Sequence, residues 1–318
     1  MDGAPLNYLT AAGSRAFPIL WLTWGVIAIS VAVMLVIAIL VAEGIRRNRQ
    51  TLAEPTAGVI SGENPVRWIY AGVGVSCIVL VAAAAWTLYV LSALAYEVPP
   101  DGPTVEVAAH QWWWGMRYLD SDPSKIFSTA NEMHIPVGVP VRIVLNSSDV
   151  IHSFWVPALG GKTDVIPGQT NTAVIEAEKP GIYLGQCTEY CGQQHAHMGL
   201  RVVADKPDDY ARWRAEQLQP HAVPPPGSEA ARGETAFVTR CGGCHRVRGT
   251  LAGGVLGPDL THLAERGTLA AGSLPNKPAY LSAWILEPQR IKPGTQMPAL
   301  PLSGPELQAI RTFLEEGS

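Results

Sequence analysis

Two long segments without a charged residue, residues 17–42 and 68–96, constrain the fold of this chain more than any other feature. A helix needs about 20 apolar residues to cross the hydrocarbon core of a membrane, so both segments are long enough to span it. Tryptophan or tyrosine stands near the ends of each, which is typical of the membrane interface. A buried helix of a soluble domain is the alternative, but uncharged segments of this length are rare there. The sequence therefore predicts an N-terminal transmembrane helical hairpin.

Basic residues around the two segments predict the orientation of the hairpin. The loop between them is expected to contain Arg46, Arg47, Arg49 and Arg67, whereas only Arg15 precedes the first segment. The positive-inside rule then places this loop in the cytoplasm, and both termini with everything after about residue 97 on the outer side. Residues 2–14 lack the basic start and apolar core of a secretory signal peptide, so either a signal was removed or the first span serves as one.

Residues 104–204 have the pattern of an all-β domain. Short segments rich in β-branched residues, such as 141–145 and 172–175, alternate with Pro-Gly turns. About 100 residues of this kind are typical of a small Greek-key sandwich or barrel.

Soft metal ligands are concentrated in the last loop of this domain. It reads Cys187-Thr-Glu-Tyr-Cys191-Gly-Gln-Gln-His195-Ala-His-Met198. Thiolate and imidazole select copper or zinc over magnesium or calcium, and a thioether is common for copper but unusual for zinc. His152, in an earlier loop, offers a second imidazole, as in blue-copper folds. Because two cysteines are present, they can bridge two copper ions, each with one histidine. His197 does not match a ligand position and is interpreted as a surface residue or a neighbour of the ligands.

The C-terminal part carries a second cofactor motif. Residues 207–219 predict a short polar helix, and the Pro-rich segment after it predicts a stiff linker. Cys241-Gly-Gly-Cys244-His245 is the haem-attachment motif, in which both cysteines bind the porphyrin covalently and His245 binds the iron. A redox or zinc site is the alternative for the cysteine pair alone.

Segments that follow the attachment motif favour haem. Lys292-Pro-Gly-Thr-Gln-Met297-Pro resembles the loop that presents the axial methionine in class I cytochromes c, which disfavours His262 as the second iron ligand. A His/Met ligand pair raises the reduction potential of a haem. Helices are expected at 230–241, at 278–286, with Tyr280 and Trp284 in the haem pocket, and from a capping box at 303–306 to about residue 316.

With these motifs in place, residues 15–204 resemble cytochrome c oxidase subunit II. The resemblance rests on the helical hairpin, the copper loop and three further motifs, namely Gln111-Trp112-Trp113-Trp114, His152-Ser-Phe and Gly161-Lys-Thr-Asp-Val-Ile-Pro-Gly168. It implies that Cys187 and Cys191 bridge the two ions of a binuclear copper (CuA) centre. His152 and His195 would each bind one copper.

The same resemblance assigns the remaining site residues. Met198 and the backbone carbonyl of Glu189 would be axial copper ligands, and the Glu189 carboxylate would bind magnesium at the interface with subunit I. Trp112 would lie on the electron-entry surface, although aromatic packing explains the three tryptophans equally well. The chain would hold no catalytic residue, because oxygen is reduced in subunit I.

Fold class and function follow from the resemblance as expectations. The domains would be a transmembrane hairpin (1–97), a cupredoxin-like all-β Greek-key domain (98–206), a helix and linker (207–227) and an all-α class I cytochrome c domain (228–318). The chain would be subunit II of a proton-pumping, caa-type oxidase in a bacterial cytoplasmic (inner) membrane. It would pass electrons from covalently bound haem c to copper and on to haem a and the haem–copper site of subunit I. Subunit III, and cytochrome c or a quinol-oxidising complex as donor, would be further partners.

Other functions fit the sequence less well. A membrane-anchored copper carrier needs exposed, exchangeable ligands, and a fused cytochrome argues for a permanent redox centre instead. Nitrous oxide reductase would need a further large domain, and related quinol oxidase subunits lack the copper ligands. Charged residues make up 16% of the chain, against about 25% in typical soluble proteins, and no basic run indicates nucleic-acid binding.

Overall fold

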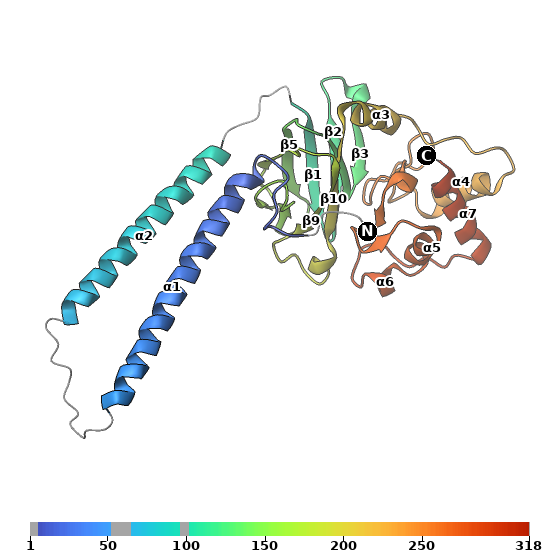
Figure 1. Ribbon diagram of the computed structural model, residues 1–318. Helices are drawn as coiled ribbons and strands as arrows, with labels where there is room; N and C mark the ends of the chain where they lie inside the picture. The colour runs from blue at the N-terminus through green and yellow to red at the C-terminus, as the bar shows by residue number, and fades with distance from the viewer. Residues whose placement is uncertain (1–5, 52–64, 96–101, 318) are drawn as a thin grey trace. The chain divides into compact units, whose positions relative to one another are not determined.

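The computed structural model describes residues 6–51, 65–95 and 102–317, which form two compact units. One unit is the helical pair within residues 17–97. The other joins the residues up to Ala16 with those from Val98 onward, and it contains the β domain and the C-terminal helices (Figure 1).

The first unit confirms the predicted hairpin. Helices α1 (Ala16–Thr51) and α2 (Pro65–Leu94) include candidate membrane spans at Ala16–Arg47, with mean hydropathy 3.0, and Val66–Leu94, with mean hydropathy 2.2. The ring of Trp86 lies against Gly25, where a Cβ atom would be 2.3 Å from the ring, so a glycine lets the two helices approach.

The arginines assigned to the loop lie on the helices instead. Arg46 and Arg47 belong to the end of α1, where each forms an ion pair of 2.9 Å with Glu43, and Arg67 lies in the first turn of α2. Glu–Arg pairs at spacings of three and four residues stabilise a helix, which explains why α1 continues past its uncharged part. The prediction of a loop there was therefore wrong, although the basic residues still mark the same end of the hairpin. Glu63, which precedes α2 in the sequence, lies outside the described residues.

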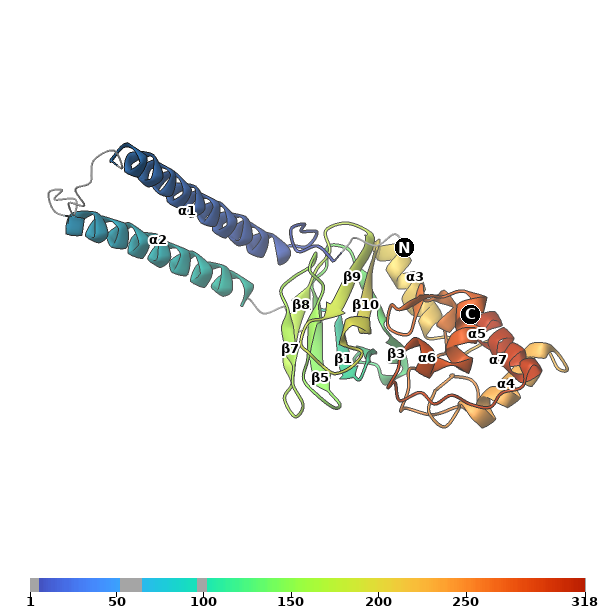
Figure 2. The same cartoon turned by 90° about the horizontal axis from the view of Figure 1, so that it is seen from below.

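The middle of the chain is a sandwich of two five-stranded sheets, which confirms the predicted all-β domain (Figures 1 and 2). One sheet has the order β3 (Phe127–Ala130), β2 (Trp113–Leu119), β1 (Thr104–His110), β5 (Val141–Ser147), β8 (Asn171–Ile175). The other has the order β4 (Glu132–Pro136), β10 (Gly199–Asp205), β9 (Gly181–Cys187), β6 (His152–Trp155), β7 (Thr163–Val165). The pairs β1–β5 and β4–β10 are parallel, so the chain crosses over between these strands, and the other pairs in the two sheets are antiparallel.

Alternating side chains build the core between the sheets. In β1 and β10 every second residue is buried, so one face of each strand points inward. Residues just before α1 also join this domain, because Ala12 N donates to Ala158 O at 2.7 Å and Glu178 N donates to Ala12 O at 2.9 Å.

Helix α3 (Pro207–Gln217) follows the sandwich and packs against it through Trp213. The Trp213 ring stacks on His134, with centroids 4.2 Å apart and planes 10° apart. His134 is itself held by Asp205, at 2.6 Å from Nδ1. His134 therefore connects α3 to the end of β10.

The C-terminal part is helical, as predicted, with a small two-stranded sheet added. Its elements are α4 (Glu229–Arg240), η3 (Leu263–Glu265), β11 (Thr268–Leu269), β12 (Leu274–Pro275), α5 (Pro278–Leu286), α6 (Pro288–Ile291) and α7 (Gly304–Glu316). Helices α4 and α7 cross at Gly233, where a Cβ atom would lie 1.9 Å from Ala309 O. The predicted capping box at Ser303 and Glu306 begins α7. His221 is buried against Phe313, with its Nδ1 3.1 Å from Ala222 O.

Candidate copper and haem sites

The two thiols of the copper loop lie next to each other inside the sandwich. Cys187 ends β9 and Cys191 follows in the next turn, with their Sγ atoms 3.7 Å apart and both side chains buried. His152, at the start of β6, completes a group whose three candidate ligand atoms lie within 4.8 Å of one another. Pairing of β6 with β9 opposes Phe154 to Cys187, and this register brings the distant histidine to the loop.

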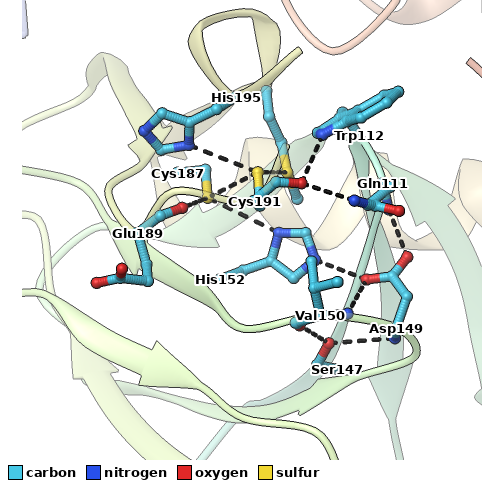
Figure 3. A network of polar contacts seen from close by, with 11 residues as sticks. Gln111, Trp112, Ser147, Asp149, Val150, His152, Cys187, Glu189, Cys191 and His195 are labelled. Atoms are coloured by element: carbon cyan, nitrogen blue, oxygen red, sulfur yellow. Dashed lines mark hydrogen bonds and ion pairs between the residues drawn. The ribbon is translucent and has the colours of Figure 1, made fainter. Parts of the chain in front are cut away.

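The other predicted ligands surround this group (Figure 3). Nδ1 of His152 lies 3.8 Å from Cys187 Sγ, and Nδ1 of His195 lies 3.5 Å from Cys191 Sγ. Met198 Sδ is 3.8 Å from Cys191 Sγ, and the Glu189 carbonyl oxygen is 3.3 Å from Cys187 Sγ. The exposed Glu189 carboxylate points away from the sulfurs (Figure 3). All six residues selected from the sequence are thus brought together.

The donor set fits a soft metal pair. The hydrogen bond from Cys191, supported by His152, lowers the pKa of the Cys187 thiol far below its ordinary value, and the same contact raises the pKa of Cys191. One proton therefore leaves the sulfur pair readily, whereas the second leaves only when a cation lies beside them. Two thiolates, two imidazoles and a thioether are the ligand types that copper prefers.

Asp149 is a residue of this site that the sequence reasoning missed. Its Oδ1 lies 2.8 Å from His152 Nε2, and its Oδ2 accepts a hydrogen bond of 2.6 Å from the backbone N of Gln111. The carboxylate therefore holds the imidazole with Nδ1 directed at Cys187 (Figure 3). A carboxylate behind a ligand histidine is a recurrent arrangement, so an acidic residue three positions before His152 was the available signal.

The three tryptophans have three different environments. Trp114 is fully buried in the core, and Trp113 stacks on His110 with centroids 4.2 Å apart. Trp112 donates from Nε1 to the carbonyl oxygen of Cys191 at 2.9 Å. Core packing thus explains Trp114, while Trp112 contacts the copper loop directly.

A cavity of about 290 Å³ lies among the C-terminal helices. The four residues selected as haem ligands or attachment points all line it, namely Cys241, Cys244, His245 and Met297. Trp284 lines it as predicted, but Tyr280 does not and is exposed, so its assignment to the pocket was wrong. His262 lies outside the cavity, with Nε2 3.1 Å from Gln219 O.

His245 is prepared to bind iron. Its Nδ1 donates to Pro258 O at 2.9 Å, which leaves Nε2 for a metal. Burial lowers the pKa of the imidazole, so the neutral, ligating form is favoured. A Cβ atom at Gly257 would lie 2.6 Å from the ring, so only glycine fits beside it. The cysteine spacing, the oriented histidine and the apolar cavity fit a covalently attached haem.

The β domain supplies part of the wall of this cavity. Gln111, Trp112 and Trp113 line it together with the C-terminal residues. Lys292, from the segment before Met297, is buried at the same place, and burial lowers the pKa of its ammonium group to about 7. The candidate haem cavity and the copper loop therefore share Trp112 as a common neighbour.

Comparison with known proteins finds two protein families along the chain. Residues 119–205 match the family model of the periplasmic domain of cytochrome c oxidase subunit II, and residues 230–318 match that of cytochrome c. The cytochrome c oxidase subunit 2 of Alkalihalophilus pseudofirmus is 39% identical over 220 residues, which cover 69% of this chain and 62% of that protein. This chain therefore spans less than two thirds of the length of that relative.

A solved structure is also similar. The crystal structure of the periplasmic domain of subunit II of cytochrome oxidase from Bradyrhizobium japonicum shares 32% identity, covers 38% of this chain and 96% of its own, and has a TM-score of 0.36. The two matched families lie in the order in which the copper loop and the haem-attachment motif occur along the chain. Residues 119–205 therefore form the periplasmic domain of the cytochrome c oxidase subunit II family, and a cytochrome c domain follows it in the same chain.

Proposed function

We propose that this chain is the electron-entry subunit of a proton-pumping, haem–copper cytochrome c oxidase in a bacterial cytoplasmic membrane. The observation that carries the proposal is the position of Trp112, which lines the candidate haem cavity and donates to the carbonyl of Cys191. One side chain thereby contacts both redox sites of the same chain. Haem and copper supply one-electron redox chemistry when bound, and the residues described above hold them and exclude water.

Each ligand has a defined task in this proposal. Cys187 and Cys191 would hold two copper ions through their thiolates, and His152 and His195 would add one imidazole to each. Met198 and the Glu189 carbonyl would complete the ligand set, and the copper pair would supply one-electron redox chemistry. The Glu189 carboxylate, which points away from the sulfurs, is free to hold magnesium against subunit I. Cys241 and Cys244 attach the haem, and His245 and Met297 bind its iron.

Oxygen is reduced in a partner according to the same proposal. This chain would accept electrons from cytochrome c or a quinol-oxidising complex at the residues that would hold the haem, and would deliver them from the copper residues to haem a and the haem–copper site of subunit I, with subunit III as a further partner. Both termini and both redox domains lie on the outer side of the membrane, because the arginines mark the other end of the hairpin. The buried thiols disfavour a copper carrier, whose ligands must exchange with a partner.

A single-turnover experiment on the purified oxidase complex tests this function. Rapid reduction of the haem should be followed by reduction of the copper pair, seen as loss of its near-infrared absorption. Cys191→Ser should abolish that absorption and stop oxygen reduction from reduced cytochrome c. Cys77→Ser is the matched control, because Cys77 is an exposed residue of α2 far from both motifs in the sequence. Oxygen reduction at the full rate in Cys191→Ser would rule the proposal out.

The covalent connection adds a second test. A short linker keeps donor and acceptor at roughly millimolar effective concentration, so transfer from haem to copper within the chain should persist at high salt. Loss of this step at high ionic strength would mean that the two domains meet only as screened, separate partners.

A further inference from the structure

Lys292 occupies an unusual position for a charged residue. Only 3% of it is exposed, and its ammonium group donates to three backbone carbonyl oxygens. They are Trp112 O at 2.7 Å, His197 O at 2.7 Å and Ala270 O at 3.1 Å. An ammonium group has three protons, so each proton has its own acceptor. A buried cation is tolerated only when it is satisfied in this way.

These acceptors belong to two domains. Trp112 and His197 are part of the β domain, whereas Lys292 and Ala270 belong to the cytochrome domain. His197 lies between the candidate copper ligands of its loop, and Trp112 contacts Cys191. The lysine therefore connects the segment that carries Met297 with the segment that carries the copper ligands.

The two residues after Lys292 extend the same contact. Pro293 O accepts a hydrogen bond of 2.9 Å from Gln194 Nε2. Gly294 has a φ angle of +85°, and a Cβ atom there would lie 2.9 Å from Gln193 Oε1 and 3.4 Å from the Trp112 ring. Three consecutive residues thus lie against the copper loop or Trp112, and the positive φ angle of Gly294 disfavours any other residue there.

We propose that Lys292 is the positioning residue that fixes how the cytochrome domain docks on the copper domain, and so keeps the Met297 loop against Trp112. Lys292 selects one docked arrangement because of the geometry of its hydrogen bonds. If the domains shift by a few ångströms, the ammonium group stays buried but loses acceptors, which is strongly unfavourable. The proposal rests on the proposed electron transfer for its functional meaning, but the docking itself can be measured without electrons.

Two other hydrogen bonds join the β domain to the cytochrome domain and can be used to measure docking. Gly199 N, in the β domain, donates to Ala271 O at 2.9 Å, and Gly267 N, in the cytochrome domain, donates to Glu132 Oε2 at 3.0 Å. Neither involves Lys292. Amide hydrogen exchange in peptides containing Gly199 and Gly267 therefore measures how often the interface opens.

Lys292→Leu in the full oxidase complex is the test, with Lys277→Leu as the matched control. Lys277 is an exposed residue of the same domain, so its replacement removes the same charge without touching the interface. Hydrogen bonds from a buried charge typically stabilise by an amount equivalent to roughly a tenfold to hundredfold change in equilibrium constant, so protection at both amides should fall in that range. Haem-to-copper transfer should slow, while the absorption spectra of both centres stay unchanged.

The outcomes separate the two proposals. Wild-type protection and wild-type transfer in Lys292→Leu would overturn the role of Lys292 and leave the proposed function intact. Reduced protection from hydrogen exchange with unchanged haem-to-copper electron transfer would support the docking role of Lys292. It would contradict the proposed electron-transfer route through this interface. An equal effect of Lys277→Leu would show that net charge, rather than Lys292, controls docking. If Lys292→Leu does not assemble, Lys292→Gln keeps an amide donor and should lower protection by less; full protection there would also overturn the proposal.

Discussion

Replacing Asp149 with asparagine should weaken copper binding without removing a ligand. The carboxylate accepts from Val150 N at 2.7 Å and Gln111 N at 2.6 Å, in addition to its contact with His152. An asparagine of the same shape has one oxygen instead of two. Either His152 Nε2 loses its acceptor, or the backbone N–H of Gln111 faces the NH2 group of the new asparagine, which is also a donor.

The structure sets the size of the effect. A hydrogen bond to a charged group contributes about 1.5–3 kcal/mol, and loss of a carboxylate behind a ligand histidine typically weakens metal binding by about 10–100-fold. His152 is fully buried, so water cannot replace the lost acceptor. We therefore expect Asp149→Asn to bind copper about 10–100-fold more weakly. The near-infrared absorption of the molecules that still hold copper should change little.

Competition with a copper chelator, followed through that absorption in the full-length chain, measures the affinity. Asp164→Asn is the control, because Asp164 is an exposed residue of β7 in the same domain and its removal also lowers the negative charge by one. Equal copper affinity in Asp149→Asn and the wild type would refute the argument that the carboxylate orients His152.

Three further substitutions test other parts of the structure. Gly233→Ala gains about 1 kcal/mol of helix propensity, but its Cβ atom would lie 1.9 Å from Ala309 O. Because overpacking costs about 1–3 kcal/mol or more, calorimetry should show a lower melting temperature than in the wild type. An unchanged or higher melting temperature would contradict the close packing of α4 on α7. Burial lowers the pKa of His134, yet its hydrogen bonds to Asp205 and Glu132 outweigh burial, so the pKa is raised. Protonated His134 therefore stabilises the fold fully below about pH 6.5, the pKa of histidine in the unfolded chain, and this stabilisation is lost as the pH rises through the higher pKa of the folded state. Urea unfolding at several pH values should show the loss, and His134→Gln should make the free energy of unfolding less dependent on pH. Met297→His should lower the haem reduction potential in a potentiometric titration, whereas an unchanged potential would exclude Met297 as the ligand.

That the candidate copper residues lie together could be predicted from the sequence because most of them are local. All but His152 lie within one loop, where spacing alone limits the geometry. The same holds for the haem-attachment motif and for the capping box of α7. The hairpin was predictable from hydropathy, but its helix ends were not, because ion pairs of Glu43 extend α1 beyond the apolar segment.

Residues that act through distant contacts escaped prediction. Lys292 reaches a carbonyl 180 positions earlier, and nothing near it in the sequence indicates burial. Tyr280 was assigned to the haem cavity from its place on an expected helix, but α5 directs it to solvent while Trp284 lines the cavity. The direction of a side chain on a short helix depends on packing that a nine-residue segment does not specify.

The contact between the two domains would suit the proposed electron transfer within one chain. Separate carriers must bind one another weakly, so that they can part, and must still find one geometry. A linker makes encounter frequent, and the interface then has only to select the geometry. A buried lysine satisfied by three carbonyl oxygens does this, because only the docked arrangement offers all three acceptors to its ammonium group. Lys292 is therefore expected to stabilise one orientation of the Met297 loop on Trp112, since a shifted interface would leave the ammonium group buried without acceptors.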